Sequence, residues 1–279
     1  MSGSPPRRPG GFPARLPQAP AGQRPGPDAS SRVLRPQRPL EEAALAERLR
    51  QAPTGVGLDS QAVRARMVAR LASEGVRCEP VLAAMGRVPR HLFVDSALMA
   101  QAYEDTSLPI GLGQTISKPA VVARMLALLV QRPGVAGSVA ARAPLGRVLE
   151  IGTGCGYQAA LLSRLARSVF SIERLKPLHE RARANLDAAG IAGVRLVWGD
   201  GRLGHAPNAP YDTIVSAAGG QELPPAWAQQ LAVGGRLVVP LHSPADGGQV
   251  LVVIDRGADG WHRSVHDAVH FVPLKSGTE

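Results

Sequence analysis

The 279-residue chain has few cysteines, few aromatic residues and no long hydrophobic run. The two cysteines, Cys78 and Cys155, are too few for a disulfide scaffold or a four-cysteine zinc site, so a reducing, cytoplasmic location is expected. Aromatic residues make up 4% of the chain, which argues against an aromatic-rich β-sandwich. No run of 18 uncharged apolar residues occurs, so we expect neither a membrane-spanning helix nor a membrane partner. The six histidines from His179 onward lack metal-ligand spacing to cysteines or acids, and we expect no metal.

Positive charge is concentrated at the N-terminus. The chain carries 32 Lys and Arg against 22 Asp and Glu, a net charge of +10. Residues 1–40 hold seven arginines and one acid, and also ten prolines and five glycines. Because so little apolar surface cannot offset the entropy of ordering, we expect residues 1–58 to be a disordered tail rich in proline and arginine. Nucleic acid could bind only through this tail and is disfavoured, because no Tyr or Trp is interleaved for base stacking.

Residues 59–279 read as one folded domain. Apolar spacing predicts helices near residues 63–71, 80–85 and 121–130, with a loop over 88–119 and another over 131–146. Strands are then expected at 147–151, 168–173, 194–197, 211–216 and 235–241, alternating with helices at 157–166, 175–189 and 225–231. This alternation predicts an α/β fold with a doubly wound, Rossmann-like sheet preceded by N-terminal helices. Segments 249–255 and 265–271 are expected to close the sheet as an antiparallel hairpin.

A glycine-rich turn follows the first of these strands. Residues 150–156 read EIGTGCG, a G-x-G-x-G spacing that differs from the G-x-G-x-x-G of dinucleotide sites and lacks the Lys-Ser or Lys-Thr of a phosphate loop. Its glycines let a ligand approach the backbone closely, and Glu150 suits a ligand that carries an ammonium group. A tight strand-to-helix turn without a ligand is the alternative interpretation.

Acidic residues follow the next two strands. Glu173 can accept hydrogen bonds from both ribose hydroxyls, although an acid there also favours the dipole of the following helix. Asp200 in the sequence Gly199-Asp200-Gly201 can accept from an adenine amino group, although a lone Asp-Gly is often an Asx turn. Three such turns at successive strand ends predict a site for a nucleoside with a cationic amino-acid part, which is S-adenosylmethionine.

These motifs resemble those of class I S-adenosylmethionine-dependent methyltransferases. More narrowly, residues 88–94 (VPRHLFV), 108–111 (LPIG), 113–117 (GQTIS) and 271–274 (FVPL) resemble the protein-L-isoaspartate O-methyltransferase family. The resemblance runs from about residue 60 to 275. It implies a seven-stranded mixed sheet with an antiparallel C-terminal hairpin. It also implies protein repair, in which a methyl group is transferred to the free carboxylate of L-isoaspartyl residues in damaged proteins and peptides.

The resemblance also implies site residues. Ser117 matches the family's active-site serine, and we expect it to position the acceptor carboxylate, because a carboxylate is already ionised near pH 7 and needs no general base. A serine that caps the following helix is the alternative, and both roles are compatible. The expected cofactor-binding residues are Thr115, Ile116, Glu150, Gly152, Thr153, Gly154, Gly156, Glu173, Asp200 and Gly201. The expected acceptor-binding residues are Thr115, Ser117, Ala218, Val272, Pro273 and Leu274.

Three features depart from the family pattern. Segment 131–146 is longer than usual and reads as a surface insertion, and the arginine-rich tail has no counterpart that we can match. After residue 218 the family usually has proline, whereas this chain has Gly219 and Gly220. Two other functions stay open. One is a related methyltransferase acting on a peptide natural product or RNA, and the other is a nucleic-acid-binding protein without activity.

Deleting residues 1–58 should leave the affinity for S-adenosylhomocysteine within about threefold, or about 0.7 kcal/mol, because the tail has no apolar face to dock. Calorimetric titration of the full and the shortened chain measures this difference. A loss of about tenfold or more on deletion would instead show that the tail closes over the cofactor site.

Overall fold

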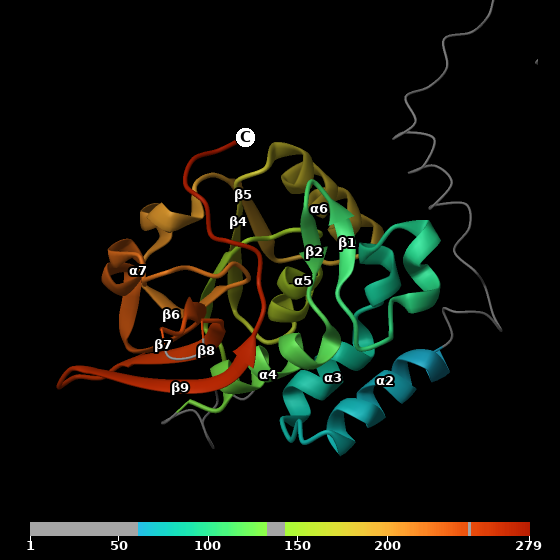
Figure 1. Cartoon of the computed structure of the whole chain (residues 1–279), viewed down its shortest axis with the longest axis horizontal. Helices are drawn as coiled ribbons and strands as arrows, with labels where there is room; N and C mark the ends of the chain where they lie inside the picture. Colours follow the sequence, from blue (N-terminus) through green and yellow to red (C-terminus); the bar gives the residue numbers. More distant parts are fainter. Residues whose placement is uncertain (1–60, 133–142, 245–246) are drawn as a thin grey trace, which may run out of the picture. The chain divides into compact units, whose positions relative to one another are not determined.

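The computed structural model of the chain describes residues 61–132, 143–244 and 247–279 (Figure 1). The predicted tail over residues 1–58 and most of the predicted 131–146 insertion therefore lie outside the described residues. The described part is built around a seven-stranded sheet, whose strand order is β5-β4-β3-β6-β7-β8-β9. The first five strands in this order are parallel, and the last two pair antiparallel. Both the mixed sheet and its closing hairpin confirm the prediction.

The strands of the large sheet lie close to the predicted segments. Their bounds are Arg147–Ile151 for β3, Ser168–Glu173 for β4, Val194–Trp198 for β5, Tyr211–Ser216 for β6, Leu231–His242 for β7, Gln249–Arg256 for β8 and Trp261–Val269 for β9. The last strand was misplaced: it begins at Trp261 rather than at 265 and ends before Phe271. Most of its residues are exposed, so the apolar pattern used for the prediction carries little information there.

Helices cover both faces of this sheet. Alternate residues of the central strands point to opposite faces, so Val148 and Val169 join one buried cluster while Leu149 and Phe170 join another. The helices of the first cluster are α2 (Gln61–Ser73), α3 (Glu79–Arg87), α4 (Pro119–Val130), α5 (Tyr157–Ser163) and α6 (Lys176–Ala188), and α7 (Pro225–Gln230) belongs to the second. This two-sided covering is the doubly wound arrangement that the alternating pattern predicted. Helix α5 ends three residues earlier than expected.

A small hairpin and two short helices lie within the predicted 88–119 loop. Strands β1 (Leu108–Gly111) and β2 (Gln114–Ile116) pair antiparallel, and the short helices η1 (Arg90–Phe93) and η2 (Ser96–Gln101) precede them. The two residues at its tip, Leu112 and Gly113, both have positive φ (53° and 69°), as in the tight turns that suit hairpins. Of the residues that suggested a loop, Pro109, Gly111 and Gly113 belong to this hairpin. Arg181 of α6 donates to the Ile110 carbonyl oxygen (2.7 Å) and fixes the hairpin beside the glycine-rich turn.

The chain's direction through the sheet places a switch point between β3 and β6. From β3 the chain moves outward to β4 and β5, and it then returns to β6 on the other side of β3. In such sheets ligands bind beyond the carboxyl ends of the strands at this point. The predicted glycine-rich turn follows β3, so the fold brings the candidate residues to that edge of the sheet.

Several smaller expectations can be checked against the described residues. Cys78 and Cys155 are both free and buried. Tyr211 is a core residue, as expected, whereas Trp198 ends β5 with 47% of its surface exposed. None of the helices in the described ranges combines the length and the hydrophobicity needed to cross a bilayer. Over the same ranges no cluster of three or more His, Cys, Asp or Glu side chains is arranged to hold a metal ion.

Candidate active site

A cavity lies beyond the carboxyl ends of β3, β4 and β6, between the β1–β2 hairpin and the segment that follows β9. Twelve of the predicted site residues line it: Thr115, Ile116, Ser117, Gly152, Thr153, Gly154, Glu173, Gly201, Ala218, Val272, Pro273 and Leu274. Three others, Glu150, Gly156 and Asp200, are not among its lining residues. Every predicted acceptor-binding residue therefore faces the cavity, and the three exceptions all come from the cofactor set.

The glycine-rich turn forms the floor of the cavity. Gly152, Gly154 and Gly156 all have positive φ (86°, 54° and 91°), which side chains other than glycine rarely allow. A Cβ atom on Gly154 would lie 3.2 Å from Ile110 of the hairpin, so only glycine leaves this approach open. The reason for Gly156 differs from the predicted one. A Cβ atom there would lie 3.3 Å from Leu186 of α6, so this glycine is needed for packing against that helix.

Glu173 ties the turn to the end of β4. Its Oε2 accepts from the Gly154 amide (2.8 Å) and its Oε1 from the Leu175 amide (3.0 Å), which lies next to the start of α6. The side chain is 5% exposed and lines the cavity. A carboxylate oxygen has two lone pairs, so each oxygen can accept a second hydrogen bond from a ligand. The ribose interpretation and the helix-terminus interpretation are therefore both compatible with this geometry.

Glu150 lies behind the glycine-rich turn rather than in the cavity. It is fully buried and accepts a hydrogen bond from the Ser171 hydroxyl, which lies 2.6 Å from the Thr153 hydroxyl. Burial raises the pKa of Glu150 from 4.5 to about 8. Burial thus favours the uncharged carboxyl, and Glu150 is not among the residues that line the cavity, so the contact with an ammonium group stays a prediction. Its place in the structure is that of a support: through Ser171 it fixes Thr153, which does line the cavity.

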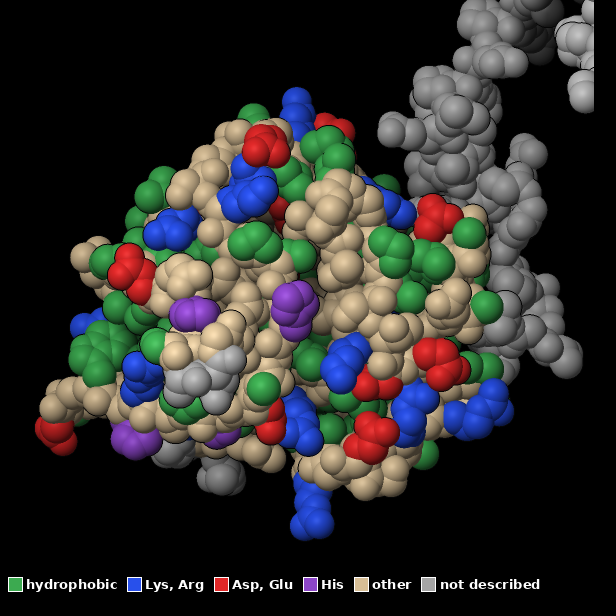
Figure 2. All heavy atoms as spheres, in the orientation of Figure 1, with side chains coloured by type: hydrophobic (Ala, Val, Ile, Leu, Met, Phe, Trp, Pro, Cys, Tyr) green, Lys and Arg blue, Asp and Glu red, His purple; other side chains and the backbone are tan. Residues whose placement is uncertain are grey.

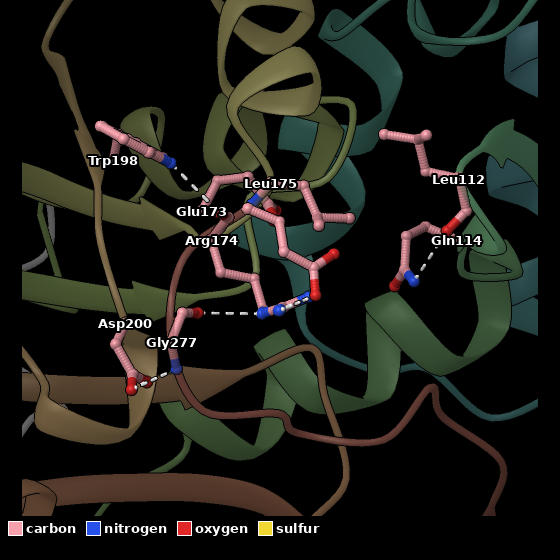
Figure 3. Close-up of polar contacts among 9 residues, drawn as sticks. Leu112, Gln114, Glu173, Arg174, Leu175, Trp198, Asp200 and Gly277 are labelled. Carbon is pink, nitrogen blue, oxygen red and sulfur yellow. Dashed lines mark hydrogen bonds and ion pairs between the residues drawn. The ribbon is translucent and has the colours of Figure 1, made fainter.

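Both carboxylate oxygens of Asp200 accept hydrogen bonds from backbone amides of the protein (Figure 3). Its Oδ1 accepts from the Arg202 amide (2.8 Å) at the start of the short helix η4 (Gly201–Leu203), and its Oδ2 accepts from the Gly277 amide (2.7 Å). The Asx-turn alternative thus describes its local contacts. Gly201 does line the cavity, and its carbonyl oxygen is held by the indole N–H of the buried Trp227 (2.8 Å).

Sequence reasoning missed Arg174. This side chain lines the cavity, donates from Nε to the Gly277 carbonyl oxygen (3.1 Å), and pairs through Nη2 with Glu279 (2.7 Å) (Figure 3). Lys275, which precedes the bonded residues Gly277 and Glu279, also lines the cavity. The position directly after Glu173 was the available signal, but no local pattern connects residue 174 with residues a hundred positions away.

The two glycines that depart from the family pattern help to build the acceptor side. The Gly219 amide donates to the Val272 carbonyl oxygen (2.8 Å), and the Leu274 amide donates to the Gly219 carbonyl oxygen (2.7 Å). A proline at position 219 would lack the first donor. The Gly220 amide in turn donates to the Pro240 carbonyl oxygen (3.1 Å). The departure therefore changes the bonding that holds the 272–274 segment against the cavity.

Ser117 stands where the cavity meets a second groove. It lines both of them and lies between β2 and α4. The expected capping role is wrong, because the residue before α4 is Lys118 and the first turn is held by Asp105, which accepts from the Ala120 amide (2.8 Å). Within the described ranges the Ser117 hydroxyl makes no hydrogen bond of its own. It is therefore available to a ligand that enters the cavity.

Comparisons with known proteins agree with this geometry. A family model for protein-L-isoaspartate(D-aspartate) O-methyltransferases matches residues 62–279. The chain belongs to that family. A Methylibium petroleiphilum protein named protein-L-isoaspartate O-methyltransferase is 60% identical over 273 residues, covering 96% of this chain and 96% of the relative. One of the same name from Leptothrix cholodnii is 62% identical, covering 88% of this chain and 84% of the relative.

Solved structures give the same result. A protein-L-isoaspartate O-methyltransferase structure, 28% identical, aligns with a TM-score of 0.65 over 76% of this chain and 66% of its own. A Plasmodium falciparum structure containing S-adenosyl-L-homocysteine aligns with a TM-score of 0.62 over 76% of this chain and 98% of its own; at 23% identity it supports the fold alone.

The family membership establishes the activity. The enzyme transfers a methyl group from S-adenosylmethionine to isoaspartyl residues of proteins. One expectation is corrected by the same comparisons. An alignment that covers 96% of the chain must include most of the arginine-rich tail, so this tail does have a counterpart in the Methylibium relative.

Glu173→Ala should lower the affinity for S-adenosylhomocysteine by about ten- to a hundredfold, because a charge-assisted bond to the cofactor is lost. The melting temperature should fall as well, since the Gly154 and Leu175 amides lose their acceptor. Asp200→Ala is the matched control, and its affinity loss should stay within about threefold. Calorimetric titration and thermal unfolding measure both effects. Equal losses of affinity in the two variants would contradict the assignment of Glu173 to the cofactor.

Glu150→Gln should change how stability depends on pH. The folded protein keeps the Glu150 proton up to about pH 8, whereas the unfolded chain loses it near 4.5. The stability that wild type has at low pH is therefore lost progressively as the pH rises through this range. A glutamine cannot ionise, so Glu150→Gln should gain stability relative to wild type between pH 5 and pH 8.

Urea unfolding at several pH values measures this difference, with the exposed Glu180→Gln as control. A difference that is constant with pH would mean that Glu150 has an ordinary pKa. A large loss of cofactor affinity in Glu150→Gln at pH 6 would instead support the ammonium contact that the sequence suggested.

Proposed function

We propose that the cavity binds the methyl donor against the glycine-rich turn and the acceptor carboxylate against Ser117. The free hydroxyl of Ser117 at the junction of cavity and groove carries this proposal. The donor side has a positive-φ glycine cradle and a carboxylate with unused lone pairs, Glu173, which suits the hydroxyls of a ribose. These residues fit the nucleoside part of S-adenosylmethionine.

The residues of the chain have little chemistry to perform. S-adenosylmethionine supplies a methyl group on a positively charged sulfur, which is a good leaving group. The acceptor is a carboxylate and is ionised near neutral pH, so no general base is required. The task left to the protein is to hold the acceptor oxygen in the right place, and misplacement by about 1 Å can cost about a hundredfold in rate. The Ser117 hydroxyl can donate one hydrogen bond to that carboxylate, as a positioning contact rather than as a nucleophile.

The acceptor side is closed by segments from distant parts of the chain. Thr115 and Ser117 come from the strand β2 and its end, and Val272–Leu274 are held by Gly219. L-Isoaspartate and L-aspartate carry the same charge but present their free carboxylates at different distances from the backbone. Because backbone hydrogen bonds hold these acceptor-side residues in place, they favour one of the two carboxylate positions. Once formed, the methyl ester cyclises without further help, and reopening gives back some normal aspartate.

The proposed partners are isoaspartyl-containing proteins and peptides. The family match selects isoaspartyl proteins over the two other acceptors that the sequence left open, a peptide natural product and RNA. The face shown in Figure 2 carries interspersed basic and acidic side chains rather than one basic patch, which gives nucleic acid no evident footprint there. We also propose a cytoplasmic location, in keeping with the two unpaired cysteines.

Ser117→Ala should lower turnover on an L-isoaspartyl peptide by about tenfold or more, with cofactor affinity within about threefold, because the hydroxyl serves the acceptor. Wild type should methylate this peptide and leave the matched L-aspartyl peptide unlabelled. The measurement is transfer of labelled methyl groups to base-labile ester. Ser163→Ala, whose hydroxyl bonds within α5, is the control and should behave as wild type. Equal labelling of both peptides, or labelling of RNA alone, would contradict the proposal.

A further inference from the structure

Arg90 is a buried cation that the proposed mechanism does not use. It begins η1, and none of its surface is exposed. Its Nε donates to the Ala102 carbonyl oxygen (2.8 Å) and its Nη2 to the Ser117 carbonyl oxygen (2.7 Å). Among the described residues no carboxylate lies within ion-pair distance of it, although that of Asp105 acts on it from farther away, and its Nη1 has no hydrogen-bond partner. A buried charge without a directly paired counter-ion is costly, so its presence needs an explanation.

The guanidinium lies directly behind the cavity wall. Its Cζ is 4.7 Å from the ring centroid of Tyr157, which lines the cavity. Burial lowers the pKa of Arg90, but an arginine stays protonated at neutral pH. From the bond to the Ser117 carbonyl oxygen, covalent geometry places Nη2 within roughly 7 Å of the Ser117 hydroxyl. Such a charge in a poorly screened interior attracts an anion bound at that hydroxyl.

We propose that Arg90 is a positioning residue that holds Ser117 in place and makes the acceptor site selective for an ionised carboxylate. The inference rests on the proposed role of Ser117. Arg90 does not line the cavity, so it acts through the Ser117 backbone and through its charge. The anion of the incoming acceptor adds a negative charge on the Ser117 side, where Arg90 has no carboxylate within ion-pair distance.

A second, half-buried arginine offers a comparison. Arg132 also holds two carbonyl oxygens, those of Asp212 (2.7 Å) and Pro144 (3.1 Å). Burial lowers its pKa too, and nearby acids partly oppose that effect, Asp212 and Asp255 for Arg132 as Asp105 does for Arg90. It lines neither the cavity nor the adjoining groove. Arg132 therefore has structural duties similar to those of Arg90, but it does not lie beside Ser117.

The test compares two acceptor peptides in the full chain. One contains L-isoaspartate, and the other carries a neutral carboxamide in place of the free carboxylate and is measured as a competitive inhibitor. Arg90→Met should lower the affinity for the carboxylate peptide by about tenfold and the affinity for the carboxamide peptide by less than about threefold. Arg90→Lys keeps the charge but cannot reach both carbonyl oxygens, so it should retain the preference for the carboxylate while turnover falls by about tenfold. Arg132→Met should leave the ratio of the two affinities unchanged.

If Arg90→Met lowers the affinity for both peptides by the same factor, Arg90 has a merely structural role and the proposal is overturned. If Arg90→Met does not fold, Arg90→Lys decides: loss of its preference for the carboxylate, or turnover equal to wild type, would overturn the proposal. Wild type is assayed first on the isoaspartyl peptide. Failure there would contradict the proposed function itself, whereas normal methylation with an unchanged affinity ratio in Arg90→Met would contradict the role of Arg90 alone.

Discussion

The bond from the Gly154 amide to the Glu173 carboxylate organises the whole donor side of the site. It joins the turn after β3 to the end of β4, while the other oxygen of Glu173 holds the Leu175 amide beside α6. The Gly152 and Thr153 amides reinforce this join by donating to the Ile172 carbonyl oxygen (2.9 and 3.2 Å). The turn is thereby fixed before any ligand arrives, which lowers the ordering cost of binding.

Two buried ionisable groups stand behind the site in opposite states. Glu150 lies under the glycine-rich turn, where burial raises its pKa to about 8, so that it supports Thr153 as a mostly neutral acid. Arg90 lies beneath Ser117 and keeps its charge, because a guanidinium does not give up its proton near neutral pH. The donor, which carries a positive sulfur, and the acceptor, which is an anion, thus meet surroundings of different charge.

Residues after β9 close the site from the far end of the chain. Val272 and Leu274 are bonded to Gly219. Gly277 is bonded to Asp200 and Arg174 (Figure 3), and Glu279 is bonded to Arg174. One short segment therefore contributes to the acceptor wall and also crosses the strand ends near the nucleoside side. This arrangement couples the two halves of the cavity mechanically, through backbone bonds rather than through a hydrophobic interface.

Local patterns in the sequence were enough to predict the doubly wound sheet, the order of its turns and the placement of Glu173 at the site, whereas Ser117 was predicted from the resemblance to the family. Strand and helix periodicity is local, and parallel strands bring their carboxyl ends to one edge whatever the details of packing. Tertiary structure alone decided what each polar group faces. Glu150 turns inward, Asp200 bonds to Gly277, and Arg90 lies under Ser117 without a carboxylate beside it. These outcomes depend on contacts between residues far apart in the chain, and no spacing within a single segment encodes which of the available partners a side chain will reach.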